Sequence, residues 1–531
     1  MVQALRVNTT KILVLLLSCL TAACGGGGGG SDSSDTRLQP SSSELRFNAG
    51  EFLPSDNYKS FCAAPRSGVS AVTGRTFDDL PGSTLEENHW LRSWTNETYY
   101  WYDEVPDLNP ADYATADYFN LLRTNEITDT GKDKDEFHFA IDTADWEAQS
   151  QTGISVSYGI DFAVVAATVP RDVVVALVEP GSAADMAGVA RGDRVLAVDG
   201  VDIDDPTSTG VNTINDGLIP SDIGEQHQFQ LQSVDGTVRS VTLTASSQSF
   251  TPVQSVRVID TINGPVGYML FTSHNAPSES LLIDAFDQFE LNEVSDLVLD
   301  LRYNGGGFLA IASQVAYMIA NPEITNNRTF ERLQFNDKHP RFNPVTGEVN
   351  DPLPFFDRSL GFSEPSGQRL PNLGLERVFV ITTGSTCSAS ESIINSLRGV
   401  GIQVVQIGSA TCGKPYGFYP TDNCGTTYFT VQFQSVNDID FGDYANGFAT
   451  AEQNRPGAVT LPGCFITDDY QHAIGDEQEG MLSAALEYVT TGNCGLDAEL
   501  QKTGVIKEDN ATILQSQWQL NRIVTPPTYQ F

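Results

Sequence analysis

Between residues 252 and 490, short apolar segments alternate with segments whose apolar residues recur at helical spacing, and this alternation constrains the fold more than any other feature. Apolar runs at residues 267–271 and 297–301 have the length of buried strands, and helical patterns follow them at residues 278–291 and 308–320. Strands that alternate with helices are typical of α/β domains. The sequence therefore predicts an α/β core in this region.

The rest of the chain predicts two further units, and so a multidomain α+β protein. A length of 531 residues is enough for roughly three domains. Residues 80–122 have a helical pattern with an aromatic stripe, which we expect to lie in a core. Residues 153–247 instead contain short predicted strands separated by turn signals such as Asp235-Gly236. We expect a helical N-terminal region, a β-rich middle domain and the α/β core.

Charge and composition exclude several classes of function. The chain has 68 acidic and 30 basic residues, giving a formal net charge of -38, which argues against nucleic acid as a partner. It contains no H-E-x-x-H motif, and its cysteines lie too far apart in the sequence for a zinc site. We therefore expect no nucleic-acid partner, no metal and no cofactor.

The first 24 residues have the features of an export signal that ends at a lipidated cysteine. Basic residues precede an apolar stretch at residues 12–20, small residues then lead to Cys24, and a Gly/Ser-rich tether follows. Cys24 is the predicted lipidation site, and Cys19 is a competing one. We expect an exported protein held on the outer membrane by its lipid alone, facing the periplasm or the cell surface.

Ser388 is the candidate nucleophile. It follows an apolar run at residues 378–382 and precedes a helical pattern that includes Ile393. A sharp turn from a strand into a helix exposes a serine hydroxyl, and the free amides of the helix N-terminus stabilise negative charge near it. The alternative interpretation is an ordinary helix N-cap formed by Ser388 or Ser390.

Lys414 is the candidate general base. It lies on a glycine-flanked loop after a predicted buried strand at residues 402–407, and no acidic residue lies within five positions of it. A lysine acts as a base only when burial lowers its pKa towards neutrality. The alternative is a solvated surface lysine, which is the usual location of this residue. A Ser-His-Asp triad is a weaker alternative, because no histidine has a clear serine and aspartate partner.

A third element, Asp300-Leu301-Arg302, leads from a predicted strand into three glycines that include Gly306. Glycine lets backbone amides approach a substrate oxygen closely, although alone it indicates only a tight turn. In order and spacing, these three elements resemble the C-terminal processing, or tail-specific, serine peptidases. That resemblance implies a Ser388–Lys414 dyad, an oxyanion hole formed by the amides of Gly306 and Ala389, and a catalytic core related to the crotonase and ClpP folds.

Phe418 departs from the family pattern, because many members have a glutamine there that assists the lysine. The third catalytic residue therefore stays open, and we expect backbone carbonyls or a hydroxyl such as that of Thr411 to orient the Lys414 amine.

The middle domain resembles a PDZ domain of the bacterial type. Tyr158-Gly159-Ile160 is similar to its carboxylate-binding loop, and residues 179–193 are similar to its core signature. The resemblance implies that protein or peptide substrates with free C-termini bind here. Taken together, these features predict an extracytoplasmic serine endopeptidase of the tail-specific type. The alternatives are a catalytically silent PDZ-containing scaffold lipoprotein and, at the level of fold only, an acyl-CoA enzyme.

Six cysteines beyond the signal form an even set, as expected for disulfides in an exported protein. Cys387 precedes the nucleophile and Cys412 precedes Gly413-Lys414, so disulfides are expected to brace both loops. The pairings we expect are Cys412 with Cys424 and Cys464 with Cys494.

The predicted divisions of the chain are a signal peptide at residues 1–24, a tether at 25–48, an N-terminal helical domain at 49–150, a PDZ-like domain at 151–250, a catalytic domain at 251–490 and a C-terminal appendage at 491–531.

Overall fold

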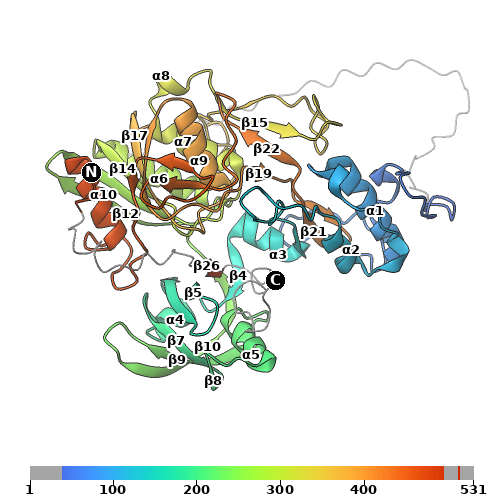
Figure 1. Cartoon of the computed structure of the whole chain (residues 1–531), viewed down its shortest axis with the longest axis horizontal. Coiled ribbons are helices and arrows are strands. Elements are labelled where there is room, and N and C mark those ends of the chain that lie inside the picture. The colour runs from blue at the N-terminus through green and yellow to red at the C-terminus, as the bar shows by residue number, and fades with distance from the viewer. Residues whose placement is uncertain (1–38, 496–511, 515–531) are drawn as a thin grey trace, which may run out of the picture. The chain divides into compact units, whose positions relative to one another are not determined.

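The structure is a computed structural model that describes residues 39–495 and 512–514 (Figure 1). The described residues from Pro40 onward belong to one compact unit. The predicted signal peptide with Cys24, and most of the predicted C-terminal appendage, lie outside the described residues. Within the described part of the chain, every helix is too short or too polar to span a membrane.

The α/β core is built on a six-stranded sheet in the order β12-β13-β14-β17-β18-β25. The strands from β13 to β25 are parallel, and β12 pairs antiparallel with β13 at one edge. The predicted strands are therefore confirmed. The bounds are β12 Val253–Thr261, β13 Gly264–Phe271, β14 Asp296–Asp300, β17 Arg377–Thr382, β18 Gln403–Gly408 and β25 Gly463–Cys464.

Helices cover both faces of this sheet. Leu297 and Leu299 of β14 pack in a cluster with α6, α7 and α9, whereas Val298 packs in a second cluster with α10. Successive side chains of a strand point to opposite faces, so strands buried on both faces are apolar without alternation. The helix bounds are α6 Ser278–Leu291, α7 Leu309–Ile319, α8 Pro322–Thr325, α9 Ala389–Gly399 and α10 Gly480–Thr491.

Smaller sheets extend the core. One has the order β16-β15-β22-β19, and β23 pairs with β24. Their bounds are β15 Thr329–Phe335, β16 Leu353–Pro354, β19 Tyr416–Gly417, β22 Phe433–Val436, β23 Phe448–Thr450 and β24 Val459–Leu461.

The N-terminal region is helical, as predicted, and packs on the core. In α1, the rings of Trp90 and Trp94 stack with centroids 5.1 Å apart and lie against Tyr428. Strand β3 of this region pairs antiparallel with β21 of the core, so its sheet is completed by the core. The bounds are β1 Phe61–Cys62, β2 Leu80–Pro81, α1 Thr84–Thr98, α2 Thr115–Leu121, β3 Phe139–Asp142, α3 Thr143–Glu147, β20 Thr421–Asn423 and β21 Thr426–Phe429.

The middle domain has its own sheet, in the order β10-β9-β7-β6-β5-β26, with β8 beside β7. Helix α5 was not predicted, because Gly210 and Gly217 interrupt its pattern. Strands β4 and β11 pair where the chain enters and leaves the domain. The bounds are β4 Ile154–Ser157, β5 Ile160–Ala166, β6 Asp172–Val178, α4 Ala183–Met186, β7 Arg194–Val198, β8 Val201–Asp202, α5 Ser208–Leu218, β9 Gln226–Gln232, β10 Val238–Thr244, β11 Ser246–Ser249 and β26 Thr512–Leu514.

The disulfides correct one expected pairing and confirm the other. Cys464 pairs with Cys494 as expected. Cys412, however, pairs with Cys387, and Cys424 pairs with Cys62 of the N-terminal region. The error arose because residues 62 and 424 are distant in sequence, yet the N-terminal region packs on the strand pair β20–β21 beside Cys424.

Candidate active site

Three loops meet at the carboxyl ends of neighbouring parallel strands. The glycine-containing segment follows β14, the turn bearing Ser388 follows β17, and the loop bearing Lys414 follows β18. Side chains that follow parallel strands gather at one edge of a sheet, which is where α/β proteins bind ligands. The fold therefore brings together the elements that the sequence singled out.

Ser388 lies in a strained turn between β17 and α9. Its backbone has φ 56° and ψ -118°, in a region that residues with a side chain rarely adopt. Such strain persists only where surrounding contacts impose it, and a sharp strand-to-helix turn presents the hydroxyl away from the backbone. The N-cap interpretation correctly gives the position of Ser388. Ser390, by contrast, donates its hydroxyl to the carbonyl of Asn304 at 3.0 Å.

Lys414 is buried, with 8% of its surface exposed, so the surface-lysine alternative is wrong. Its Nζ lies 4.0 Å from the centroid of the Phe418 ring and 4.8 Å from that of Phe137. Burial lowers the pKa of Lys414 to about 8, although the charges of Asp135 and Glu391 act in the opposite direction. A lysine with such a pKa is neutral in about a tenth of the molecules at pH 7, far more often than a free lysine.

Glu391 joins the nucleophile turn to the lysine loop. Its carboxylate accepts the N–H of Ser388 at 3.1 Å, and the N–H groups of Gly413 and Lys414 at 2.9 and 2.8 Å. The Thr411 hydroxyl, which was expected to orient the Lys414 amine, donates to the same carboxylate at 2.5 Å. Burial raises the pKa of Glu391, while these hydrogen bonds favour its charged form.

A disulfide fixes the same two loops covalently. Cys387 directly precedes Ser388, Cys412 lies two residues before Lys414, and their Cα atoms are 5.3 Å apart. The expectation that disulfides brace the loops of Ser388 and Lys414 is confirmed, with a single bond joining the two loops.

Gly306 lies against the nucleophile turn. A Cβ atom at this position would be 2.8 Å from Ser388 Cβ and 3.0 Å from the nitrogen of Ala389, so only glycine fits. Ala389 is the first residue of α9, where an amide has no acceptor within the helix. The N–H of Gly306 donates to Asn304 Oδ1 at 2.9 Å in this structure. Both predicted oxyanion-hole residues thus flank Ser388, and the amide of Gly306 is hydrogen-bonded to the Asn304 side chain.

Asn304 connects the glycine segment to its surroundings. Its Oδ1 also lies 3.0 Å from Nδ1 of His274, and its backbone carbonyl accepts the N–H of Cys387 at 3.0 Å. Burial lowers the pKa of His274 to about 4, so this histidine is neutral and supports the loop.

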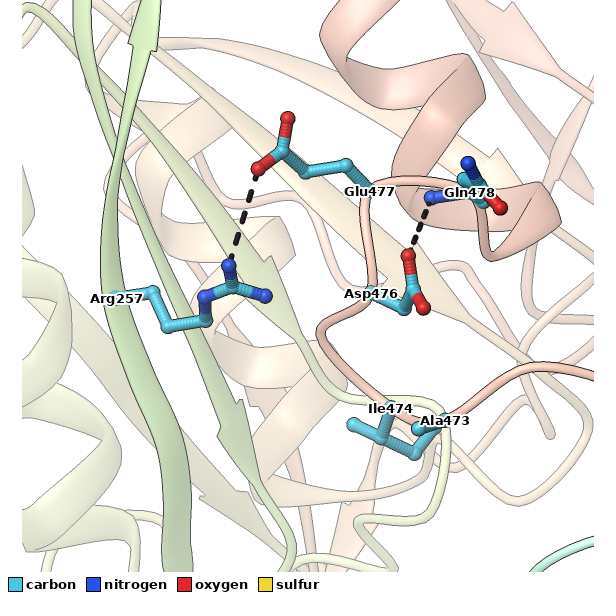
Figure 2. A pocket seen from close by; sticks show the side chains of 6 residues that line it. All are labelled: Arg257, Ala473, Ile474, Asp476, Glu477 and Gln478. Atoms are coloured by element: carbon cyan, nitrogen blue, oxygen red, sulfur yellow. Dashed lines mark hydrogen bonds and ion pairs between the residues drawn. The ribbon is translucent and has the colours of Figure 1, made fainter.

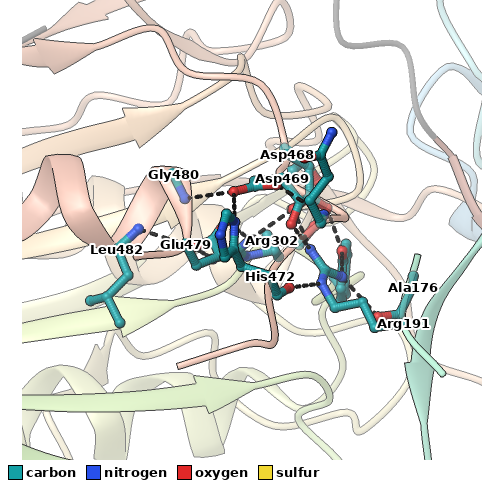
Figure 3. Close-up of polar contacts among 12 residues, drawn as sticks. Ala176, Arg191, Arg302, Asp468, Asp469, His472, Glu479, Gly480 and Leu482 are labelled. Carbon is teal, nitrogen blue, oxygen red and sulfur yellow. Dashed lines mark hydrogen bonds and ion pairs between the residues drawn. The ribbon is translucent and has the colours of Figure 1, made fainter. Parts of the chain in front are cut away.

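Arg302 of the Asp-Leu-Arg motif belongs to a buried charge network with Asp468 and Glu479 (Figure 3). Arg302 binds Asp300, Glu479 and Asp468 at distances of 2.7 to 2.8 Å. Burial alone would raise the pKa of Asp468, but Arg191 and Arg302 outweigh it and lower that pKa to about 2. The network holds the end of β14 in place.

Sequence reasoning missed the N-terminal wall of the lysine pocket. The Phe137 ring lies beside Lys414, the charge of Asp135 acts on the Lys414 amine, and the Asp135 carboxylate accepts the hydroxyl of Tyr99 at 2.7 Å. No sequence signal links these residues to Lys414, because they belong to a different domain. Glu391 was visible in the motif that contains Ser388, but its spacing alone did not indicate that it binds both loops.

In the middle domain, the predicted carboxylate-binding loop is anchored by internal hydrogen bonds. The Tyr158 hydroxyl donates to the carbonyl of Gly217 at 3.0 Å, and the Tyr158 carbonyl accepts the N–H of Ala184 at 3.1 Å. Gly159 donates its N–H to the Ser157 hydroxyl at 2.9 Å, and Ile160 begins β5. The loop therefore lies directly before strand β5.

A separate pocket lies between β12 and the segment before α10 (Figure 2). Arg257 and Glu477 face each other across it at 3.8 Å. Its lining contains none of the predicted catalytic residues; it consists of Arg257, Ala473, Ile474, Asp476, Glu477 and Gln478.

Comparison with known proteins confirms the two resemblances. Residues 265–430 match the model of peptidase family S41, and residues 174–210 match a PDZ domain model. The carboxyl-terminal-processing protease of Picosynechococcus is 30% identical over 158 residues, which cover 27% of this chain and 34% of that protein. Carboxyl-terminal-processing peptidase 1 of Arabidopsis thaliana, a chloroplast protein, is 28% identical over 239 residues, 44% of this chain and 42% of that protein.

The matches to these relatives are partial. The chain spans about a third of the length of the cyanobacterial relative. A solved S41 protease structure from Bacteroides fragilis superimposes with a TM-score of 0.57 at 24% identity, over 75% of this chain and 96% of that one. This likeness shows the same multidomain fold.

Proposed function

We propose, from the premise that residues 265–430 form a domain of peptidase family S41, that this chain is a serine endopeptidase with Ser388 as nucleophile and Lys414 as general base. The observation that carries the proposal is the joining of the two loops. A disulfide and the Glu391 carboxylate together hold the strained Ser388 turn beside the loop of a buried lysine.

In the proposed reaction, neutral Lys414 takes the proton of the Ser388 hydroxyl as its Oγ attacks the substrate carbonyl carbon. The oxyanion of the tetrahedral intermediate is stabilised by the amide of Ala389 and by that of Gly306, which exchanges Asn304 Oδ1 for the substrate oxygen. The lysine ammonium then gives its proton to the leaving amine. Water, deprotonated by Lys414, hydrolyses the acyl-enzyme and restores Ser388.

The substrates are proteins with free C-termini, which the PDZ domain takes up at Tyr158-Gly159-Ile160 by adding a strand to its sheet. The protein works outside the cytoplasm, lipidated at Cys24 and held on the outer membrane. Three disulfides support an oxidising location, because such bonds persist outside the cytoplasm.

Ser388→Ala tests the proposal. The variant should lose casein hydrolysis by about a thousandfold or more, because no other group replaces the nucleophile. Ser366→Ala, at an exposed serine, is the matched control and should hydrolyse casein at the wild-type rate. Near-normal hydrolysis by Ser388→Ala would overturn the assignment.

A further inference from the structure

The edge strand of the PDZ-like sheet is already paired with a segment from the far end of the same chain. β26 lies antiparallel to β5, with Leu514 opposite Phe162, Ile513 opposite Ala163 and Thr512 opposite Val164. The segment therefore runs from Thr512 to Leu514 towards the loop at Tyr158-Gly159-Ile160. This is the direction in which a bound peptide would bring its C-terminus to that loop.

The two described side chains of β26 face opposite sides of the sheet, as expected for a strand. Leu514 is 4% exposed and packs in the core of the PDZ-like domain with Phe162, Ile214 and Leu218. It thus fills the space between β5 and α5 that an apolar ligand side chain would take.

Ile513 faces the catalytic domain. It is 3% exposed and packs in a cluster with Ala163 of the PDZ-like sheet and Tyr303 of the Asp-Leu-Arg segment. Its N–H donates to the hydroxyl of Ser385 at 3.2 Å, on the turn that leads to Ser388. The strand therefore contacts both the peptide groove and the loops of the active site.

Arg191 provides a second contact between the same two domains (Figure 3). Its guanidinium donates to the carbonyl of Ala176 at 2.8 Å and to Asp468 at 2.6 Å, within the network of Arg302. The PDZ-like sheet and the Asp-Leu-Arg segment thus share both an ionic and an apolar contact, and Ile513 belongs to the apolar one.

We propose that residues 512–514 are an internal ligand of the PDZ groove, which a substrate chain end must displace before it can pair with β5. This inference rests on the proposed function, in which the groove binds peptides. The edge of a strand pairs with one partner at a time, so the segment and the substrate compete. Displacement also removes Ile513 from Tyr303 and Ser385. The contacts of the proposed catalytic loops therefore differ between a groove that holds substrate and a groove that holds the internal segment.

The competition has a measurable consequence. A groove that is free in a tenth of the molecules binds a peptide about tenfold more weakly than an open groove. Leu514→Asp places a charge in the PDZ core position of the segment, and Ile513→Asp places one against Tyr303 without altering that core. Ile262→Asp is the matched control, because Ile262 is 91% exposed.

The experiment uses the full chain in a Ser388→Ala background, with a fluorescein-labelled peptide ending in Ala-Thr-Ile-Leu and a free carboxylate. Peptide binding is measured by fluorescence anisotropy, and amide hydrogen exchange is followed in β5 and in the β9–β10 hairpin. Leu514→Asp and Ile513→Asp should bind about tenfold more tightly than the parent and lose protection in β5 while keeping it in the hairpin. Ile262→Asp should match the parent.

Equal, measurable affinity in all proteins, or unchanged protection of β5, would overturn the internal ligand. If Leu514→Asp also loses protection in the hairpin, that variant has destabilised the whole PDZ-like domain. The affinity and the β5 protection of Ile513→Asp then test the proposal instead. A different result would count against the proposed function instead: equal binding of the peptide and its C-terminally amidated form, with β5 exposed in the variants, would show that the groove does not recognise a chain end.

Discussion

At the scale of single residues, the carboxylate of Glu391 joins the two loops that bear the proposed Ser388–Lys414 dyad. It accepts hydrogen bonds from the Ser388 turn and from the lysine loop, and it is fully buried. A buried carboxylate that loses its donors is costly, so these bonds fix the spacing of the two loops.

Glu391→Gln should lower kcat at least tenfold with little change in KM, because an amide NH2 group would face N–H donors and loosen the spacing without touching the substrate. Peptidase assays across substrate concentration measure both constants. Glu290→Gln, at an exposed glutamate, is the control and should leave both unchanged. A change in KM alone would contradict this role of Glu391.

The buried Lys414 also makes stability depend on pH. Its pKa is about 8 in the folded chain against an ordinary value of 10.5, so between these values the unfolded chain holds a proton that the folded chain lacks. Stability therefore rises with pH across that window, and below it the lysine destabilises the fold by about 3 kcal/mol. Lys414→Met should raise the melting temperature at pH 7, and the difference should shrink towards pH 10.5. A difference that stays constant with pH would contradict the lowered pKa.

At the scale of elements, the turn before α9 and the loop after β18 act as one unit because a disulfide closes them. Cys387 and Cys412 are 25 positions apart, and a disulfide closing a loop of that size stabilises a protein by about 3 kcal/mol. The bond also restricts the motion of both dyad residues relative to each other.

Replacing both Cys387 and Cys412 by alanine should lower the melting temperature and also lower kcat. Replacing Cys62 and Cys424 by alanine is the control: it removes a disulfide outside the site, so it should lower the melting temperature while keeping kcat near the wild-type value. Equal effects on kcat from the two pairs would show that the Cys387–Cys412 bond has only a structural role.

At the scale of the whole molecule, the sequence predicted the parts whose signal is local. The strands of the core were predicted because burial on both faces makes them continuously apolar, and the sequence placed Ser388, Lys414 and Gly306 directly after such strands. Their proposed catalytic roles came from the resemblance to the tail-specific peptidases. The wall formed by Asp135 and Phe137 was missed, because packing between domains leaves no periodic pattern in either one. The pairing of Cys62 with Cys424 and the place of β26 in the PDZ-like sheet were missed for the same reason.

The most direct test of the central claim, that neutral Lys414 is the base for Ser388, is the pH dependence of kcat/KM for Lys414→Arg beside the wild type. The wild-type kcat/KM should rise with pH along a titration curve whose midpoint lies near 8, the pKa of the buried amine. The kcat/KM of Lys414→Arg should be about a thousandfold below the wild-type value at every pH, because a guanidinium keeps its proton and cannot act as a base. Lys338→Arg, at a lysine outside the site, should follow the wild-type profile. Turnover by Lys414→Arg within tenfold of the wild type would contradict the account.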